Sequence, residues 1–168
     1  MKKTISIICF LLLASRSDAI TSDSISVHAI DTKNNVLYLE LGGSAANILS
    51  VNYERSIGSN FSLRIGYSSF RMGDARLTTL PLMAHYLLPL FSSSNNLDVG
   101  LGLLAVRIKG GRGTVFGLDA AGGLGVTGFI GYRYQPKDGG LVFKIGVAPV
   151  LLRGHSIGLL GLGFGQSF

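Results

Sequence analysis

Apolar residues alternate with polar or small residues along most of the chain beyond residue 35. A period of two places successive side chains on opposite faces of an extended strand. Segments rich in glycine, serine, asparagine and proline separate the alternating runs, as turns do between strands. The pattern predicts eight strands, at residues 36–42, 48–56, 61–70, 77–88, 97–108, 124–135, 141–151 and 156–168.

The two faces of these strands differ in chemistry. One face is apolar in every strand, as in the runs that contain Leu39, Ile65 and Phe143, and it carries tyrosines near the strand ends. A soluble sandwich would show water a polar face instead. A transmembrane barrel turns its apolar face to lipid, with aromatic girdles at the interfaces, and its closed sheet leaves no strand edge unpaired. We therefore predict an all-β, closed antiparallel eight-stranded transmembrane β-barrel. The girdle tyrosines would be Tyr53, Tyr67, Tyr86, Tyr132 and Tyr134.

The opposite face carries charged side chains in the middle of strands, and these must be paired inside the barrel. Folding about the predicted turns sets Glu54 roughly opposite Arg64 and His85 roughly opposite Asp98. The predicted polar network of the lumen comprises Glu40, Asn52, Glu54, Arg64, His85, Asp98, Arg133 and Lys144. An eight-stranded barrel is just wide enough for side chains to fill. We therefore expect no open solute channel.

The first residues have the organisation of a secretory signal peptide. Lys2 and Lys3 precede an apolar run that is too short to span a bilayer, and small residues follow it. We expect a cleaved signal peptide at residues 1–19, a polar leader at 20–34 and the barrel at 35–168. Cys9 lies inside the signal, so the mature chain has no cysteine for a disulfide or a thiolate site. Export also makes nucleic acid an improbable partner.

Candidate catalytic chemistry is sparse. The pair His85 and Asp98 has the residue types of a catalytic triad, but no serine lies in a G-x-S-x-G turn. The three histidines lie on unrelated segments, and "KGGRG" at 109–113 lacks the ending of a phosphate-binding loop. The sequence therefore predicts no enzyme, no metal site and no cofactor.

The strand sequences resemble a known family. "VLYLELGG", "LSVNYERSIG", "FSLRIGYSSF", "TTLPLMAHYLL", "LDVGLGL", "GFIGYRYQPKDGGLVFKIGVAPVLL" and the ending "GLGFGQSF" are similar to small outer-membrane β-barrel proteins of Gram-negative bacteria. The most specific pieces are "NYER", "TTLPL" and "GYRYQPKDGG". The resemblance covers nearly the whole mature chain. It implies a porin-like fold and a location in the cell outer membrane, and it carries over no catalytic residues.

The resemblance also implies a role for the last strand. In such proteins a terminal strand that ends on an aromatic residue is read by the outer-membrane assembly machinery. Phe164 and Phe168 would supply this assembly signal here. Gln166 departs from the pattern, because an apolar or aromatic residue is favoured at its lipid-facing position. The register places Gln166 near the periplasmic interface.

An excess of basic residues is expected at the extracellular loops. Barrels of this type have short periplasmic turns and both chain ends on the periplasmic side. The turns at Gly58, Ser93 and Pro136 would then be periplasmic, and the other loops, including 43–46, would face outward. The predicted extracellular basic rim comprises Arg71, Arg76, Arg107, Lys109, Arg112 and Arg153. Arginine suits phosphate geometry, so the hypothesis is that this rim contacts lipopolysaccharide phosphates.

Three functional interpretations remain open from the sequence. The first is an integral outer-membrane protein with a structural or envelope-interaction role, whose partners are outer-membrane lipids and, during biogenesis, the assembly machinery. The second is a small-barrel lipid-modifying enzyme. The third is a secreted soluble barrel that binds an apolar ligand. The long apolar face argues against the third, because soluble proteins rarely expose such patches.

Overall fold

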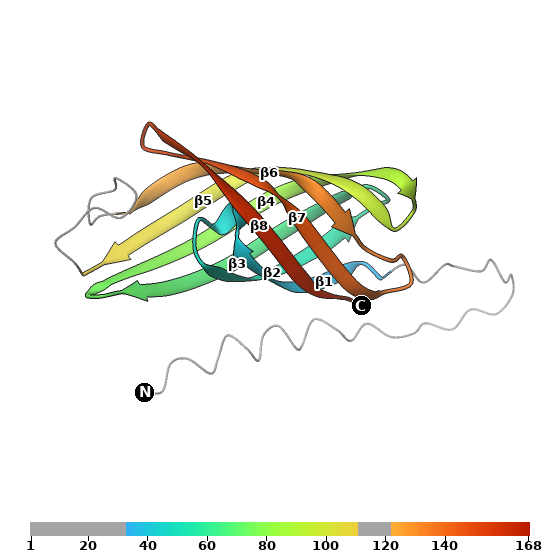
Figure 1. Cartoon of the computed structure of the whole chain (residues 1–168), viewed down its shortest axis with the longest axis horizontal. Helices are drawn as coiled ribbons and strands as arrows, with labels where there is room; N and C mark the ends of the chain where they lie inside the picture. The colour runs from blue at the N-terminus through green and yellow to red at the C-terminus, as the bar shows by residue number, and fades with distance from the viewer. Residues whose placement is uncertain (1–32, 111–121) are drawn as a thin grey trace, which may run out of the picture. The chain divides into compact units, whose positions relative to one another are not determined.

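The computed structural model describes residues 33–110 and 122–168. Eight antiparallel strands form a closed barrel, in which each strand pairs with the next along the chain and β8 pairs with β1 (Figure 1). The strands are β1 (Asn35–Gly42), β2 (Leu49–Ile57), β3 (Phe61–Met72), β4 (Ala75–Ser92), β5 (Asn95–Lys109), β6 (Gly123–Tyr134), β7 (Gly140–Leu152) and β8 (His155–Ser167). The predicted closed eight-stranded barrel is therefore confirmed, while the predicted signal peptide at 1–19 lies outside the described residues. The strands agree with the predicted segments apart from their ends, where β4 continues four residues beyond Leu88.

The two ends of the barrel differ in their connections. The end that carries Asn35, Phe168 and the short turns after β2, β4 and β6 is called here the terminal end, and the opposite end the loop end. At the terminal end the backbone N–H groups of Asn35 and Phe168 each donate to the other residue's carbonyl, at 3.1 and 2.8 Å. The ladder between β1 and β8 therefore closes up to the last residue.

The outward positions of the strands form an apolar surface. Leu39, Ile65, Leu101 and Ile145 are each 44% exposed or more, which is unusual for leucine and isoleucine in a water-soluble fold. Alternate residues on the same strands are buried in the lumen. The barrel thus has its apolar side outside and its charged side chains inside, as the alternation predicts.

Tyrosines do not form equal girdles at both ends. Tyr86, Tyr132 and Tyr134 lie in the terminal halves of their strands, Tyr53 lies at the middle of β2, and Tyr67 alone of the five predicted girdle tyrosines lies nearer the loop end. Two of the phenol groups donate to asparagine side chains at the terminal end, from Tyr53 to Asn35 and from Tyr132 to Asn95. The prediction of an aromatic girdle therefore describes the terminal end better than the loop end.

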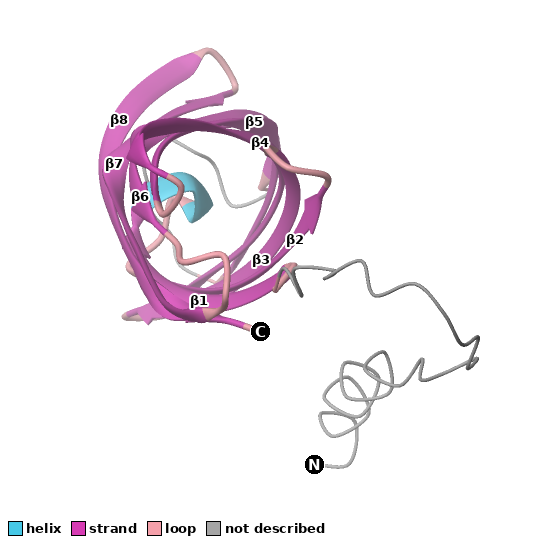
Figure 2. Ribbon diagram, turned by 90° about the vertical axis from the view of Figure 1, so that its right-hand side faces the viewer, coloured by secondary structure: helices cyan, strands magenta, loops and turns pink. Residues whose placement is uncertain are grey.

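The connection between β1 and β2 enters the barrel. Its short 3₁₀ helix η2 (Gly43–Ala45) is buried and lies within the ring of strands (Figure 2). The expectation that residues 43–46 form an outward-facing loop is wrong. Gly42 and Gly43 adopt φ values of +67° and +68°, which direct the chain inward and which other residues rarely adopt. Among the described residues, no helix is long and apolar enough to cross a membrane.

Candidate functional site

Charged side chains from most of the strands meet in the terminal and central part of the lumen. The eight residues predicted for the polar network are each no more than 1% exposed. Every strand except β8 contributes at least one of them, so the network extends across the width of the lumen. It is called here the polar half of the lumen. The structure therefore brings together all eight predicted residues.

Two carboxylates hold one part of this network. Glu54 accepts from Arg133 at 2.5 Å and from the hydroxyl of Ser62. Asp98 forms an ion pair with Lys144 at 2.7 Å and contacts the Nδ1 atom of His85 at 2.6 Å. Arg133 also lies 3.5 Å from Asp98, so it links the two carboxylates. Removal of either acid would leave two buried cations, Arg133 and Lys144, facing a single carboxylate.

A second ion pair lies beside the first group. Arg64 pairs with Glu40, and its Nε and terminal nitrogen atoms donate to the side-chain oxygen of Asn52 at 3.1 and 2.7 Å. Asn52 in turn donates to Ser50 at 2.9 Å. The guanidinium group therefore has a carboxylate and an amide oxygen as acceptors, which a buried arginine requires.

The charges of the polar half balance. Arg64, Arg133 and Lys144 supply three cations, and three carboxylates, those of Glu40, Glu54 and Asp98, face them. Buried ion pairs contribute little net stability because of desolvation, but loss of one partner typically costs about 3–5 kcal/mol. The network therefore acts as a constraint on which side chains face each other. It also fills the lumen at this level.

Two aromatic rings that the alternation pattern does not mark out complete the polar half. The ring of Tyr38 lies 5.3 Å from the guanidinium carbon of Arg64 and 5.1 Å from Lys144 Nζ. The ring of Phe129 lies 4.7 Å from the same ammonium group. Such contacts are attractive through the ring quadrupole. Their sequence signal is weak, because an inward Tyr or Phe looks like one more apolar residue in the strand.

Of the two pairs predicted from the strand register, His85–Asp98 forms and Glu54–Arg64 does not. Glu54 is directly opposite Arg64 in the ladder, yet Arg64 pairs with Glu40 of β1 and Glu54 pairs with Arg133 of β6. Asp98 is opposite Leu87, and His85 is opposite Gly100, so the His85–Asp98 contact is diagonal. A Cβ atom at Gly100 would lie 2.6 Å from the imidazole ring, and glycine makes the space that His85 occupies.

Among the described residues, His85 is not part of a hydrolase geometry. Ser62 is its neighbour across the ladder between β3 and β4, but the Ser62 hydroxyl donates to Glu54. The Nε2 atom of His85 has no hydrogen-bond partner in the described part of the chain. Ser62, His85 and Asp98 are all fully buried. The described residues therefore hold no exposed serine–histidine–aspartate set at this position.

Within residues 33–110 and 122–168, no group of three or more His, Cys, Asp or Glu side chains is arranged to hold a metal ion. The acidic residues of the lumen are instead engaged by arginine, lysine and histidine.

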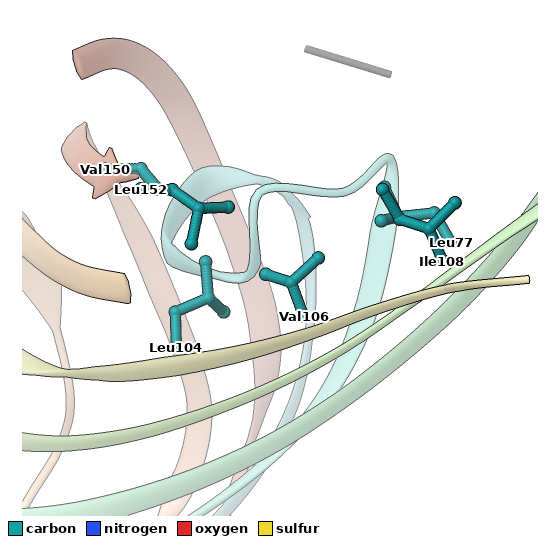
Figure 3. Packing of buried hydrophobic residues seen from close by; sticks show 6 residues of the cluster. All are labelled: Leu77, Leu104, Val106, Ile108, Val150 and Leu152. Carbon is teal, nitrogen blue, oxygen red and sulfur yellow. The ribbon is translucent and has the colours of Figure 1, made fainter. Parts of the chain in front are cut away.

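The lumen becomes apolar toward the loop end. The buried side chains there are Leu77, Leu104, Val106, Ile108, Val150 and Leu152, with Ala46 and Leu159 packed against them (Figure 3). Leu77 and Ile108 are paired across the ladder between β4 and β5. We call this region the apolar half of the lumen. The helix η2 lies inside the ring of strands, and the Ser44 hydroxyl donates to the carbonyl of Gly128 on β6 at 3.3 Å.

Basic side chains line up on the outside of the barrel at the loop end. Arg71 is directly opposite Arg76, and Arg76 is directly opposite Lys109, so three cations cross β3, β4 and β5 in one line. Arg107 is the outward-facing residue of β5 that immediately precedes Lys109, on the side away from the loop end. All four are exposed, and none has an ion pair within the described residues. These four residues are called here the basic row.

The remaining rim residues lie elsewhere. Arg153 is on the turn between β7 and β8, where its side chain passes close to Gly123 of β6, and it is not part of the basic row. Arg112 lies outside the described residues. The predicted extracellular basic rim is therefore divided into the basic row and a separate arginine.

The end of β8 has the predicted alternation. Gly161, Gly163 and Gly165 face the lumen, while Phe164 and Phe168 are 61% and 52% exposed. Gln166 is exposed between Leu37 of β1 and Leu141 of β7, at the terminal end. Its position agrees with the register, and the role of Phe164 and Phe168 in assembly stays a prediction.

No protein-family model and no curated protein sequence matches this chain. Several solved structures are similar to this chain. The N-terminal β-barrel domain of Pseudomonas aeruginosa OprF is similar with a TM-score of 0.58 at 14% identity, covering 82% of this chain and 100% of that one. The Yersinia pestis outer membrane protein Ail, solved in a phospholipid bilayer nanodisc, gives a TM-score of 0.50 at 12% identity, over 81% and 99% of the two chains. Neisserial surface protein A gives 0.50 at 13% identity, over 80% and 94%.

These similarities concern the fold. The chain has the fold of the small eight-stranded outer-membrane β-barrels. At such low identity the comparisons say nothing about individual side chains of the lumen or the basic row.

Proposed function

We propose that this protein is an integral outer-membrane β-barrel without an open solute channel, and that its basic row binds phosphate groups of lipids in the outer leaflet. The observation that carries the proposal is the line of Arg71, Arg76 and Lys109 on the outer surface at the loop end, one outward position beyond Ser69, Thr78 and Arg107. The proposed role is to support the cell envelope or to bind other envelope components, and the proposed partners are membrane lipids.

The apolar outer surface supports insertion in a bilayer. Leu80 and Leu103, below the basic row on β4 and β5, are 43% and 48% exposed. Exposed leucines on all sides of a barrel are stable in hydrocarbon and promote aggregation in water. Ail, which shares the fold, was studied within a lipid bilayer. A secreted soluble barrel is the less favoured interpretation for this reason.

The basic row supports an anionic ligand. Like charges directly opposite each other on neighbouring strands destabilise a sheet. Arg71, Arg76 and Lys109 have this unfavourable arrangement, with no acidic partner among the described residues. A phosphate placed between them would remove the repulsion and accept charge-assisted hydrogen bonds from the guanidinium groups. With the loop end on the outer side, as the proposal requires, the phosphorylated glycolipid of the outer leaflet supplies such groups.

The filled lumen supports the absence of a channel. Arg64, Arg133 and Lys144 reach across the polar half and are held by carboxylates. Passage of a solute would require separation of buried ion pairs, which is strongly unfavourable. A lipid-modifying enzyme has no support from the described residues, because His85 and Ser62 are fully buried and are not bonded to each other.

The test is retention of phosphorylated glycolipid on the purified barrel. A triple variant with Arg71→Gln, Arg76→Gln and Lys109→Gln should retain about tenfold less lipopolysaccharide, since each exposed charge pair contributes up to about 1 kcal/mol. Bound glycolipid is measured by mass spectrometry of the detergent-purified protein, with dephosphorylated glycolipid as the second ligand.

The matched control neutralises basic residues at the terminal end. Arg55 and Lys137 are exposed there and lie away from the basic row. A double variant with Arg55→Gln and Lys137→Gln should retain the glycolipid like the natural chain. Equal retention by the triple variant and the natural chain would remove the basic row as the binding site, while leaving membrane insertion untouched.

A further inference from the structure

Side chains do not completely fill the apolar half of the lumen. A cavity of about 300 Å³ remains at the loop end. Aliphatic side chains and one residue of the inward segment form most of its wall: Ala46, Val106, Val150, Leu152 and Leu159. His155 and Ser156 lie at its exposed rim. The lining is thus the kind that binds apolar molecules in proteins, with few polar groups.

One buried polar atom faces this cavity without a partner. Thr79 lines the cavity and is 1% exposed, and its Oγ1 atom has no hydrogen-bond partner in the described part of the chain. Ser68, its neighbour across the ladder, uses its own hydroxyl to bond the carbonyl of Leu49. A buried hydroxyl without a partner is unfavourable compared with a bonded one. A ligand oxygen near Thr79 would therefore improve binding.

Among the described residues, the cavity wall carries no permanently charged side chain. Histidine at 155 is the one titratable group of the described lining, and it is exposed at the rim. The ion pairs of the polar half are made by other residues deeper in the lumen, such as Arg133 and Lys144. A charged group in the cavity would lose its hydration without gaining a counter-ion. The part of the ligand that enters is therefore uncharged.

The strand pairing is incomplete beside the cavity. β1 ends at Gly42, which is opposite Gly161, so residues 155–160 of β8 pair with β7 alone. On the other side, the pairing of β2 with β3 reaches only Val51 and Tyr67. Leu159 and Ile157 of the cavity wall thus lie on a free strand edge. The cavity is therefore bordered by an unpaired strand edge as well as by its exposed rim.

We propose that this cavity is a binding site for a small, mainly aliphatic molecule that carries one uncharged hydrogen-bonding oxygen, which Thr79 binds. A dry cavity of about 150 Å³ accommodates benzene, so about 300 Å³ suits a molecule on the order of ten heavy atoms. A medium-chain alcohol has this chemistry. So does the hydroxylated part of a lipid tail, and the two sources differ in whether the ligand is free or belongs to the membrane.

The experiment uses the full barrel in lipid nanodiscs, with methyl-labelled valine and leucine and 1-decanol as the probe. Nuclear Overhauser contacts from the decanol chain should reach the methyl groups of Val106, Val150 and Leu159. Val147 faces outward on β7 and is 45% exposed, so it reports partition into the bilayer. Contacts to Val147 without contacts to the cavity residues would overturn the proposal.

The role of Thr79 is tested with Thr79→Val and a set of related ligands. The hydroxyl bond predicts that decanol binds the natural chain about fivefold more tightly than decane, and that this difference disappears in the variant. Decane itself should bind both forms equally. Decanoate should bind at least tenfold more weakly than decanol, because its carboxylate must be buried. Equal affinities of both forms for decanol would refute the contact with Thr79.

A filling substitution provides the second test. Val150→Phe should occupy the cavity and abolish decanol contacts, while Val147→Phe, on the outer surface of the same strand, should leave them unchanged. Shifted gel migration after boiling confirms that each variant is folded. Persistence of decanol contacts in folded Val150→Phe would contradict the proposed site.

Nanodiscs without added ligand distinguish the two sources. Contacts between lipid acyl protons and the Leu159 methyl groups would identify a membrane lipid as the occupant. Contacts that arise only after addition of decanol would identify a free amphiphile. Absence of both would reject the cavity as a binding site. Neither result depends on the basic row, so Arg76→Gln should leave decanol binding unchanged.

Discussion

The polar and apolar halves of the lumen fill the same barrel with different chemistry. Around Glu54 and Asp98, long charged side chains reach across the interior and leave the lumen occupied. Around Val106 and Val150, shorter aliphatic side chains leave a cavity of about 300 Å³. This space remains although η2 is also buried inside the barrel. An eight-stranded barrel has little spare interior. Side-chain length and charge therefore decide where space remains.

The two halves of the lumen should also differ in how they respond to substitution. Each ion in the polar half depends on partners from other strands, so a wrong partner leaves a buried charge alone. The aliphatic residues of the apolar half tolerate changes of packing, at a cost that rises with the volume left empty. We expect the polar half to be the sensitive region for folding and the apolar half to be the region that can accept a ligand.

The largest effect is expected from Asp98→Ala. This change leaves Lys144, His85 and Arg133 without their shared carboxylate, and the free energy of unfolding should fall by about 3–5 kcal/mol. Urea titration of the barrel in lipid vesicles, followed by gel migration, measures it. Asp138→Ala is the control, because Asp138 is exposed on a turn and should change the value by less than about 0.5 kcal/mol. Equal effects would contradict the importance of the ion network.

In the apolar half, Leu104→Ala should cost about 2–4 kcal/mol, since Leu104 is fully buried. Leu103→Ala changes the adjacent residue, which is 48% exposed on the outer surface, and should cost about 1 kcal/mol. The same urea titration compares them. A larger loss for Leu103 would mean that the inward and outward faces are assigned the wrong way round.

The inward turn of the connection between β1 and β2 predicts a smaller effect. Gly43→Ala places a Cβ atom 2.6 Å from the Glu40 carboxylate, at a residue with φ of +68°, and should cost about 2 kcal/mol. Gly58→Ala has a similar φ of +77° but open space around the added atom, and it should cost about 1 kcal/mol. Unfolding midpoints that do not differ would show that Gly43 is not packed inside the barrel.

The smallest change in stability is expected from the basic row. Arg76→Gln removes a cation from between Arg71 and Lys109, so in zwitterionic vesicles the barrel should gain a few tenths of a kcal/mol. In vesicles that contain phosphorylated glycolipid the sign should reverse, because a lipid contact is lost. Urea midpoints in the two membranes test this. The same sign in both would argue against phosphate binding by the row.

Much of the fold follows from the sequence, because period-two alternation is strong in these strands. Glu40, Arg64 and Lys144 are recognisably inward, since each is a charge between outward apolar residues. Their partners were not predictable. Strand register brings Glu54 opposite Arg64, but the long side chains extend across the lumen, where no local rule specifies the contact.

The sequence does not reveal the apolar half of the lumen either, for a related reason. At Leu104 and Val150 the inward residues lie between outward apolar ones, so hydrophobicity does not distinguish the two faces. The inward position of η2 was also missed, because a glycine pair is compatible with an external turn as well as with an internal one. Only the positive φ values and the neighbouring strands determine which occurs.

The central claim is that this chain is a closed barrel of the membrane, and gel migration of the full protein from detergent-extracted membranes tests it most directly. The account predicts that the protein is found in the outer-membrane fraction and that the unboiled, folded form migrates differently from the boiled form. A protein that fractionates without detergent and gives the same band before and after boiling would contradict it.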